Sequence, residues 1–257
     1  MAEFEVLPEA CIASILSYTT PIDACRLSLV SKTFRSAADS DTVWNKFLQS
    51  DTPLMDHVIK HSPTLANFGT KKALYMFLCD RPTTLHHRHK SFQLVRKNGK
   101  RCFMLSATFL NFLWSYPTEV EWTSLPDSRF SEIAQLRNVC TLQIHGEINT
   151  TYLSPNTWYA AYLVFKKADV WVVEHKPVEF VVSIRSGHHV SMDHYSDDQY
   201  VEGQSSRARG DGWLETEMGL FYNAPKTDED IHMNVYRIKG CNWTISLEGI
   251  EVRPYDS

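Results

Sequence analysis

The spacing of apolar residues changes near residue 91, and this change constrains the fold more than any other feature of the chain. Before it, apolar residues recur at intervals of three and four, as in Ile12, Ile15 and Leu16, which is the period of an amphipathic helix. After it, apolar and polar residues alternate in short runs such as 140–148 and 231–238, which is the period of a strand. The chain is therefore predicted to be an α+β protein with a helical N-terminal part and a strand-rich remainder.

The first fifty residues predict three short helices with almost no loop between them. Pro8 suits the first turn of a helix, where a missing N–H costs nothing. A second helix is predicted over 24–34, with Thr20 or Asp23 as its cap, and a third carries Trp44. Helices this short bury little apolar surface against one another, so the segment is interpreted as a docking module with an apolar flank that a partner covers.

Residues 51–90 predict a helical linker. Apolar spacing indicates one helix near 54–59 and another over 71–79, ended by Asp80-Arg81-Pro82. A polar connector follows at 86–89. The predicted domain boundaries are thus 1–50, 51–90 and 91–257.

The strand-rich part begins with a hairpin signal. Lys97-Asn98-Gly99-Lys100 separates two alternating runs, and Asn-Gly in that position is typical of a tight hairpin turn. Further strands are predicted at 140–148, 158–165, 178–184, 213–218, 231–238 and 245–252. Many short strands with few helices between them favour an antiparallel β-sandwich or jelly roll. One short helical turn is expected at 132–136, and a long surface loop at 186–212.

Charge and hydropathy exclude several classes. The 257 residues carry a formal net charge of −4, which gives no basic face for nucleic acid. No apolar run approaches the ~18 residues of a membrane span. Acidic Glu3 and Glu5 stand where a secretory signal would be basic. The protein is expected in the cytoplasm and nucleus.

The cysteines, two histidine groups and the common enzyme motifs give no case for a catalytic or metal site. The six cysteines form no Cys-x-x-Cys pair and are interpreted as small buried apolar residues. The histidine groups at 86–89 and 188–194 lack the spacing of a metal site. Phosphate-loop and hydrolase motifs do not occur either. We expect no catalytic residues, no metal and no cofactor.

From about residue 5 to residue 48 the chain resembles an F-box. The resemblance rests on Leu7-Pro8-Glu9, Ile12, Ile15-Leu16, Ala24, Leu27, Val30-Ser31-Lys32, Phe34-Arg35 and Trp44. It implies docking on a Skp-type adaptor, and through it on a cullin–RING ubiquitin ligase. The anchors expected in that interface are Leu7, Pro8, Ile12, Ile15, Leu16, Leu27, Val30 and Trp44. In the alternative interpretation these residues are simply the core of a helical domain.

Residues 90–254 resemble the Nictaba or phloem protein 2 lectin domain of plants. The main matching blocks are 99–107, 125–136, 159–166, 211–215, 219–223 and 249–254. The resemblance implies a carbohydrate-binding sandwich, for N-acetylglucosamine oligomers or the core of an N-glycan. Indole rings stack on the apolar faces of sugars, and carboxylates accept hydrogen bonds from sugar hydroxyls.

Only some residues of the sugar site that this resemblance implies are present in this sequence. Trp114, Trp122 and Asp230 match residues of the family's site. Val120 replaces a tryptophan, and Arg237, which has no acceptor, stands where a second carboxylate is expected. Trp114 and Trp122 are therefore either sugar platforms or core aromatics. Three more tryptophans are expected in the core: Trp158, Trp213 and Trp243.

Three functions follow from these observations. The first is a substrate-recognition adaptor of an SCF-type ligase, in which the F-box docks on the Skp-type adaptor and the sandwich selects a glycoprotein or protein. The second is a lectin that acts independently of the ligase. In the third, a sandwich that no longer binds sugar recognises a protein through its loops.

Overall fold

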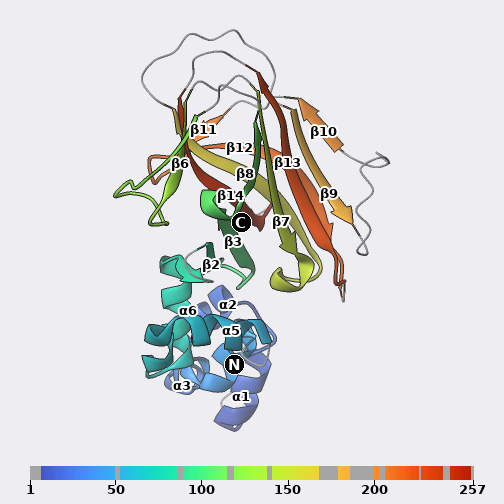
Figure 1. The fold of residues 1–257 in the computed structure, drawn as a ribbon. Coiled ribbons are helices and arrows are strands. Elements are labelled where there is room, and N and C mark those ends of the chain that lie inside the picture. The colour runs from blue at the N-terminus through green and yellow to red at the C-terminus, as the bar shows by residue number, and fades with distance from the viewer. Residues whose placement is uncertain are drawn as a thin grey trace. The chain divides into compact units, whose positions relative to one another are not determined.

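The computed structural model describes residues 7–49, 53–85, 89–114, 119–137, 141–167, 179–185, 199–202, 206–225, 227–239 and 244–255 (Figure 1). They form two compact units. The helical unit consists of the described residues of Met1–Leu85 and Phe92–Arg101, and the strand-rich unit of those of His86–Ser91 and Cys102–Asp256. No helix of the described residues is both long and apolar enough to cross a membrane.

The helical unit contains six α-helices and one 3-10 helix among its described residues. They are α1 (Glu9–Leu16), α2 (Pro21–Leu27), α3 (Lys32–Asp39), α4 (Asp41–Leu48), α5 (Pro53–His61), η2 (Pro63–Asn67) and α6 (Lys71–Asp80). The helices predicted near 54–59 and over 71–79 are therefore present.

The second predicted helix was wrong in its extent, because it is two helices. Thr20 Oγ1 accepts the N–H of Asp23 and starts α2. Ser31 then starts α3, and its Oγ accepts the N–H of Phe34 at 3.2 Å. Serine and threonine at an N-cap replace the missing intrahelical acceptor, and Ser31 thus begins a new helix within the apolar stripe.

Aromatic side chains lie at the centre of the core of the helical unit. Trp44 and Tyr75 are fully buried, with ring centroids 5.1 Å apart. Trp44 Nε1 donates to Ala38 O at 2.7 Å. The Tyr75 hydroxyl donates to the carbonyls of Val95 and Arg96, both at 3.2 Å, so the hairpin turn belongs to this unit.

The predicted hairpin is confirmed. It joins β2 (Lys90–Leu94) to β3 (Arg101–Ser106). Gly99 has a φ of +70°, which a glycine adopts without a Cβ penalty, and its N–H donates to Val95 O at 2.8 Å.

The other strands are β1 (Thr83–Leu85), β4 (Asn111–Trp114), β5 (Glu119–Thr123), β6 (Ile133–Arg137), β7 (Thr141–Asn149), β8 (Thr157–Lys167), β9 (Glu179–Arg185), β10 (Gln199–Glu202), β11 (Arg207–Ala208), β12 (Leu214–Asn223), β13 (Asp230–Lys239) and β14 (Ile245–Pro254). Short 3-10 helices, η3 (Ala107–Phe109) and η4 (Thr150–Tyr152), lie between them. All six strands predicted after the hairpin occur.

The strands form two antiparallel sheets that pack face to face. The larger runs β3-β14-β8-β12-β11 within the strand-rich unit, with β6 also paired to β14 and β5 to β6. The smaller runs β10-β9-β13-β7-β4. A Cβ on Gly146 of β7 would lie 3.1 Å from Ile250 of β14, so the sheets are in close contact. The predicted α+β organisation, with a β-sandwich after the helices, is confirmed.

Two local predictions were wrong. The expected helical turn at 132–136 is strand β6, because Ala134 pairs with Leu247 of β14 and tertiary pairing overrides a local preference. The expected loop 186–212 ends in ordered structure, since β11 pairs with β12 and Arg209 N–H donates to Trp213 O at 2.8 Å. Residues 186–198 and 203–205 lie outside the described part.

Candidate functional site

Exposed apolar side chains gather at the start of the helical unit. Among its described residues, every exposed large apolar side chain lies between residues 7 and 30. We call this the exposed apolar set: Leu7, Ile15, Tyr18, Ile22, Leu29 and Val30. Leu29 is 86% exposed and Val30 64% exposed, on a turn whose N–H groups donate to Arg26 O and Leu27 O. Concentration of apolar surface in one short stretch is typical of a protein interaction site.

The eight anchors expected in the adaptor interface divide into two groups. Leu7, Pro8, Ile15 and Val30 are exposed, and Leu27 is half-buried. The assignment of the remaining three to the interface was wrong, because they are buried in the core of this chain and offer no surface to a partner: Ile12, Leu16 and Trp44. The core interpretation therefore holds for these three residues, and the five that are exposed or half-buried stay predicted anchors.

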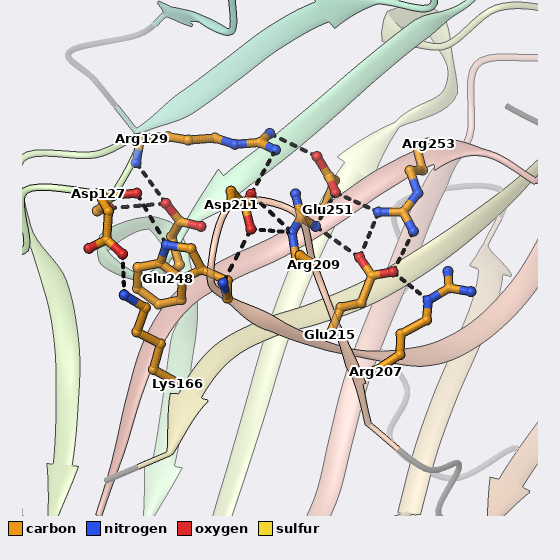
Figure 2. A network of polar contacts seen from close by, with 12 residues as sticks. Asp127, Arg129, Lys166, Arg207, Arg209, Asp211, Glu215, Glu248, Glu251 and Arg253 are labelled. Carbon is orange, nitrogen blue, oxygen red and sulfur yellow. Dashed lines mark hydrogen bonds and ion pairs between the residues drawn. The ribbon is translucent and has the colours of Figure 1, made fainter.

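An ionic network connects several strands of the described sandwich (Figure 2). Its carboxylates are Asp127, Asp211, Glu215, Glu248 and Glu251, and its cations are Arg129, Lys166, Arg207, Arg209 and Arg253. Strands β11, β12 and β14 and the segment before β6 supply most of them.

Glu251 on β14 is the centre of the network. It is almost fully buried, and its carboxylate accepts from Arg129 at 2.7 Å, Arg209 at 2.5 Å and Arg253 at 2.8 Å. Burial alone raises the pKa of Glu251, but the three guanidinium groups outweigh it and lower the pKa to about 2.

In Glu248, unlike Glu251, the effect of burial on the pKa exceeds that of the neighbouring groups. Burial raises the pKa of this carboxyl, opposed by the Arg129 N–H that donates to Oε1 at 2.7 Å. Oε2 of Glu248 has no hydrogen-bond partner among the described residues. Burial thus opposes ionisation of this carboxyl, whereas the hydrogen bonds that Oε1 accepts from Ser128 and Arg129 favour it.

The network ties together three blocks that carry the lectin resemblance: 125–136, 211–215 and 249–254. Trp213 Nε1 donates to Asp127 O at 3.1 Å, Arg209 pairs with Asp211, and Lys166 pairs with Asp127. Most of these charges are paired with one another, so the network has a structural role. It stabilises the turn before β12 and the position of the buried Trp213.

A cluster of exposed aromatic side chains lies at one end of the larger sheet. Trp158 of β8 and Tyr222 of β12 are cross-strand partners, with ring centroids 5.4 Å apart. Trp158 is 56% exposed, and Tyr255, whose N–H donates to Trp158 O at 3.0 Å, is 49% exposed. We call Trp158, Tyr222 and Tyr255 the aromatic patch.

The prediction that Trp158 is a core residue was wrong, whereas that for Trp213 is confirmed. Alternation identifies two faces of a strand but not which of them another layer covers. Trp243 lies outside the described residues.

Two of the three residues expected to bind sugar, Trp114 and Asp230, lie beside opposite ends of β7. Trp114 ends β4 opposite Leu142 of β7, whereas Asp230 begins β13 opposite Asn149 at the other end of β7. Seven residues of strand separate these two levels, about 23 Å at the rise of an antiparallel strand. Asp230 also accepts from Asn149 Nδ2 at 2.9 Å. Grouping Asp230 with Trp114 in one site was therefore wrong.

Trp122 lies on β5 and is 46% exposed. Its ring contacts Phe112 edge to face, with centroids 6.2 Å apart. Val120 is half-buried on the same strand, and the side chains of Trp114 and Arg237 lie outside the described part. Trp122 thus remains available as a stacking surface.

Comparison with known proteins matches both parts of the chain to families. The F-box domain model matches residues 4–46, and the phloem protein 2 model matches residues 100–254, more than half of the chain. The putative F-box protein PP2-B12 of Arabidopsis thaliana is 40% identical, over 96% of each chain. The F-box protein PP2-B10 of the same plant is 37% identical, over 98% of this chain and 94% of its own.

The chain is an F-box protein of the phloem protein 2 family.

Solved structures show only a distant likeness to this F-box protein. A xylan-binding domain from Paenibacillus barcinonensis is 14% identical over 56% of the chain and 85% of its own, with a TM-score of 0.29. A TM-score this low says nothing about function.

The features described above separate along the two family matches. In this F-box protein the exposed apolar set lies within the F-box match. The ionic network, Trp122 and the aromatic patch lie in the phloem protein 2 region, with Tyr255 directly after its last matched residue. The exposed apolar set therefore belongs to the F-box, and the other three features belong to the lectin-like domain.

Proposed function

We propose that this F-box protein is a substrate-recognition adaptor of an SCF-type ubiquitin ligase. Its F-box docks on a Skp-type adaptor, and its phloem protein 2 domain selects a glycoprotein or protein for ubiquitination. It has no catalytic activity of its own and acts in the cytoplasm and nucleus.

The exposed apolar set carries this proposal. Leu29, Val30 and Ile15 expose large apolar side chains that no described residue covers. Covering such groups is the main source of affinity in a docking interface, and a typical interface takes ~800 Å² from each partner.

The test is co-elution of the full chain with a Skp-type adaptor in size-exclusion chromatography. Leu29→Asp and Val30→Asp place a charge in the apolar set, and we expect each to weaken binding at least about tenfold, since an interface core excludes unpaired charge. Leu113→Asp is the matched control, because Leu113 is as exposed as Val30 but lies on the sandwich. Separate elution of the wild-type chain at micromolar concentration would contradict the proposal.

The aromatic patch favours a glycan as the group that the sandwich recognises. Trp158 and Tyr222 expose adjacent rings, and apolar sugar faces stack on such rings. Stacking of a ring on an aromatic side chain contributes ~1–3 kcal/mol, by analogy with nucleic-acid bases. A weak sugar ligand thus depends strongly on one indole.

A glycan array separates this recognition from recognition of polypeptide. We expect N-acetylglucosamine oligomers or N-glycan cores to bind, and Trp158→Ala to reduce the signal about tenfold. Trp122→Ala tests the remaining family position in the same assay, and Tyr18→Ala, an exposed ring of the helical unit, is the control. If the sandwich still captures its targets from a lysate treated with glycosidase, it recognises polypeptide instead of glycan.

The alternative is a lectin that acts independently of the ligase. This alternative predicts the same signal on the glycan array, but it predicts no complex with the Skp-type adaptor. The two measurements together therefore distinguish the adaptor from the free lectin.

A further inference from the structure

Two histidines and a glutamate meet on the smaller sheet. His145 and Glu147 are two residues apart on β7, so they project from the same face. His232 of β13 is the cross-strand partner of Glu147, and Asn234 is the partner of His145. The opposite face of this strand pair carries buried apolar residues: Ile144, Ile148, Ile231 and Met233. The polar group thus faces away from the sandwich core.

The donor atoms of these side chains are close together. Glu147 Oε2 lies 3.9 Å from His145 Nε2 and 3.9 Å from His232 Nδ1. All three ligand atoms lie within 4.8 Å of one another, and the two imidazole rings stack with centroids 5.4 Å apart. Ligand atoms of a tetrahedral zinc site lie about 3.3 Å apart, given metal–ligand distances near 2.0 Å, so small side-chain rotations would complete the site.

Asn234 orients one of the ligands. Its Oδ1 lies 2.8 Å from His145 Nδ1. An amide oxygen only accepts hydrogen bonds, so Nδ1 carries the proton and the lone pair of His145 is on Nε2, the atom that faces Glu147. Histidines that bind metals are commonly held in this way by a partner on the other ring nitrogen.

We propose that His145 Nε2, His232 Nδ1 and Glu147 Oε2 form a binding site for a zinc-type divalent cation. Two imidazoles with one carboxylate suit zinc better than calcium or magnesium, which take oxygen ligands. Three protein ligands leave a fourth position for water or for a donor atom of a bound target. The sequence predicted no metal because only the β7–β13 register brings these residues together.

Lys90 is a cation whose charge interacts with Glu147. Its Nζ packs over the rings of Phe109 and Tyr152, at 4.5 and 5.1 Å. Burial lowers the pKa of Lys90, and the nearby charge of Glu147 opposes that shift. Removing this ammonium group lowers the repulsion that a divalent cation meets at Glu147.

The test is zinc binding by the full chain in competition with a chromophoric chelator. We expect one tight equivalent, lost in His232→Ala and in Glu147→Gln. His57 and His61 form another close histidine pair, one turn apart on α5 with ring centroids 4.0 Å apart. His61→Ala breaks that pair and is the control, since it should leave zinc binding at the sheet unchanged. Asn234→Ala should weaken binding about tenfold, whereas Lys90→Met should strengthen it.

Cobalt provides an independent readout. Bound at this site, Co²⁺ should give the intense visible bands of a four-coordinate ion, and His232→Ala should abolish them. Zinc affinity that is the same in the wild type, His232→Ala and Glu147→Gln would overturn the proposal. Glu147 is exposed, so Glu147→Gln leaves the fold intact and keeps the test valid if the histidine variant is poorly folded.

Discussion

Arg253 of β14 and Glu215 of β12 form a bidentate ion pair across the intervening strand β8. Arg253 Nη2 donates to Glu215 Oε1 at 2.7 Å, and Nη1 donates to Oε2 at 2.8 Å. The guanidinium carbon lies 3.7 Å from the ring centroid of Tyr162 on β8. A planar guanidinium both stacks on a ring and matches the two carboxylate oxygens. One arginine therefore links three neighbouring strands.

We predict that the sandwich loses stability in acid through this network. Burial raises the pKa of Glu215, but Arg253, Arg207 and Arg209 lower it from 4.5 to about 2. A carboxyl whose pKa is lower in the folded state stabilises it above the unfolded pKa. This contribution is fully present above pH 4.5 and is lost as the pH falls to about 2.

Urea denaturation of the full chain between pH 7 and pH 2 measures this dependence. Glu215→Gln removes the titrating group, so its sandwich transition should depend less steeply on pH below 4.5. It should also be less stable at pH 7 by about 3–5 kcal/mol, because the arginines lose a buried partner. An unchanged acid dependence in Glu215→Gln would contradict the assignment.

Two of the three arginines that pair with Glu215, Arg253 and Arg207, should differ in their effect on stability. Arg253 has a side chain 22% exposed, and Arg207 one 60% exposed. Arg253→Lys loses the bidentate geometry and the contact with Tyr162, and should cost about 1.5–3 kcal/mol in the free energy of unfolding. Arg207→Lys should cost under about 1 kcal/mol, because solvent screens an exposed pair. Equal losses in urea denaturation would argue against the structural role of Arg253.

Burial separates two kinds of apolar residue in the F-box. Trp44→Ala removes a buried ring and its hydrogen bond to Ala38, and should lower the stability of the helical unit by about 3–5 kcal/mol. Leu29→Ala should change it by under about 0.5 kcal/mol, because Leu29 is exposed. Chemical denaturation followed by circular dichroism at 222 nm measures both. A large loss in Leu29→Ala would show that Leu29 supports the fold.

Periodicity was sufficient for much of the fold. The long strands β7, β8 and β13 were predicted because their apolar residues face a continuous core. Strands β4, β5 and β6 were missed, since they are short and since β4 and β6 depend on pairing with the distant strands β7 and β14. The break between α2 and α3 was missed because the cap of Ser31 interrupts a stripe that remains apolar.

The candidate sites were less predictable than the fold. Ile12 and Ile15 belong to the same predicted stripe, yet one is buried and the other half exposed. Trp158 alternates like a core residue but lies on an uncovered face. His145 and His232 meet through strand register, which a single sequence does not contain. In each case the missing information is the position of another segment.

Gly249 tests the contact between β14 and β3. A Cβ at this position would lie 1.8 Å from the carbonyl oxygen of Leu105, a backbone atom that cannot rotate away. Gly249→Ala must therefore push β14 from β3, where Gly249 pairs with Ser106. We expect a loss of about 3 kcal/mol or more in the free energy of unfolding. Gly210→Ala, with open space around its Cβ, should be neutral within about 0.5 kcal/mol. Similar midpoints of urea denaturation for the two variants would refute the close approach of these strands.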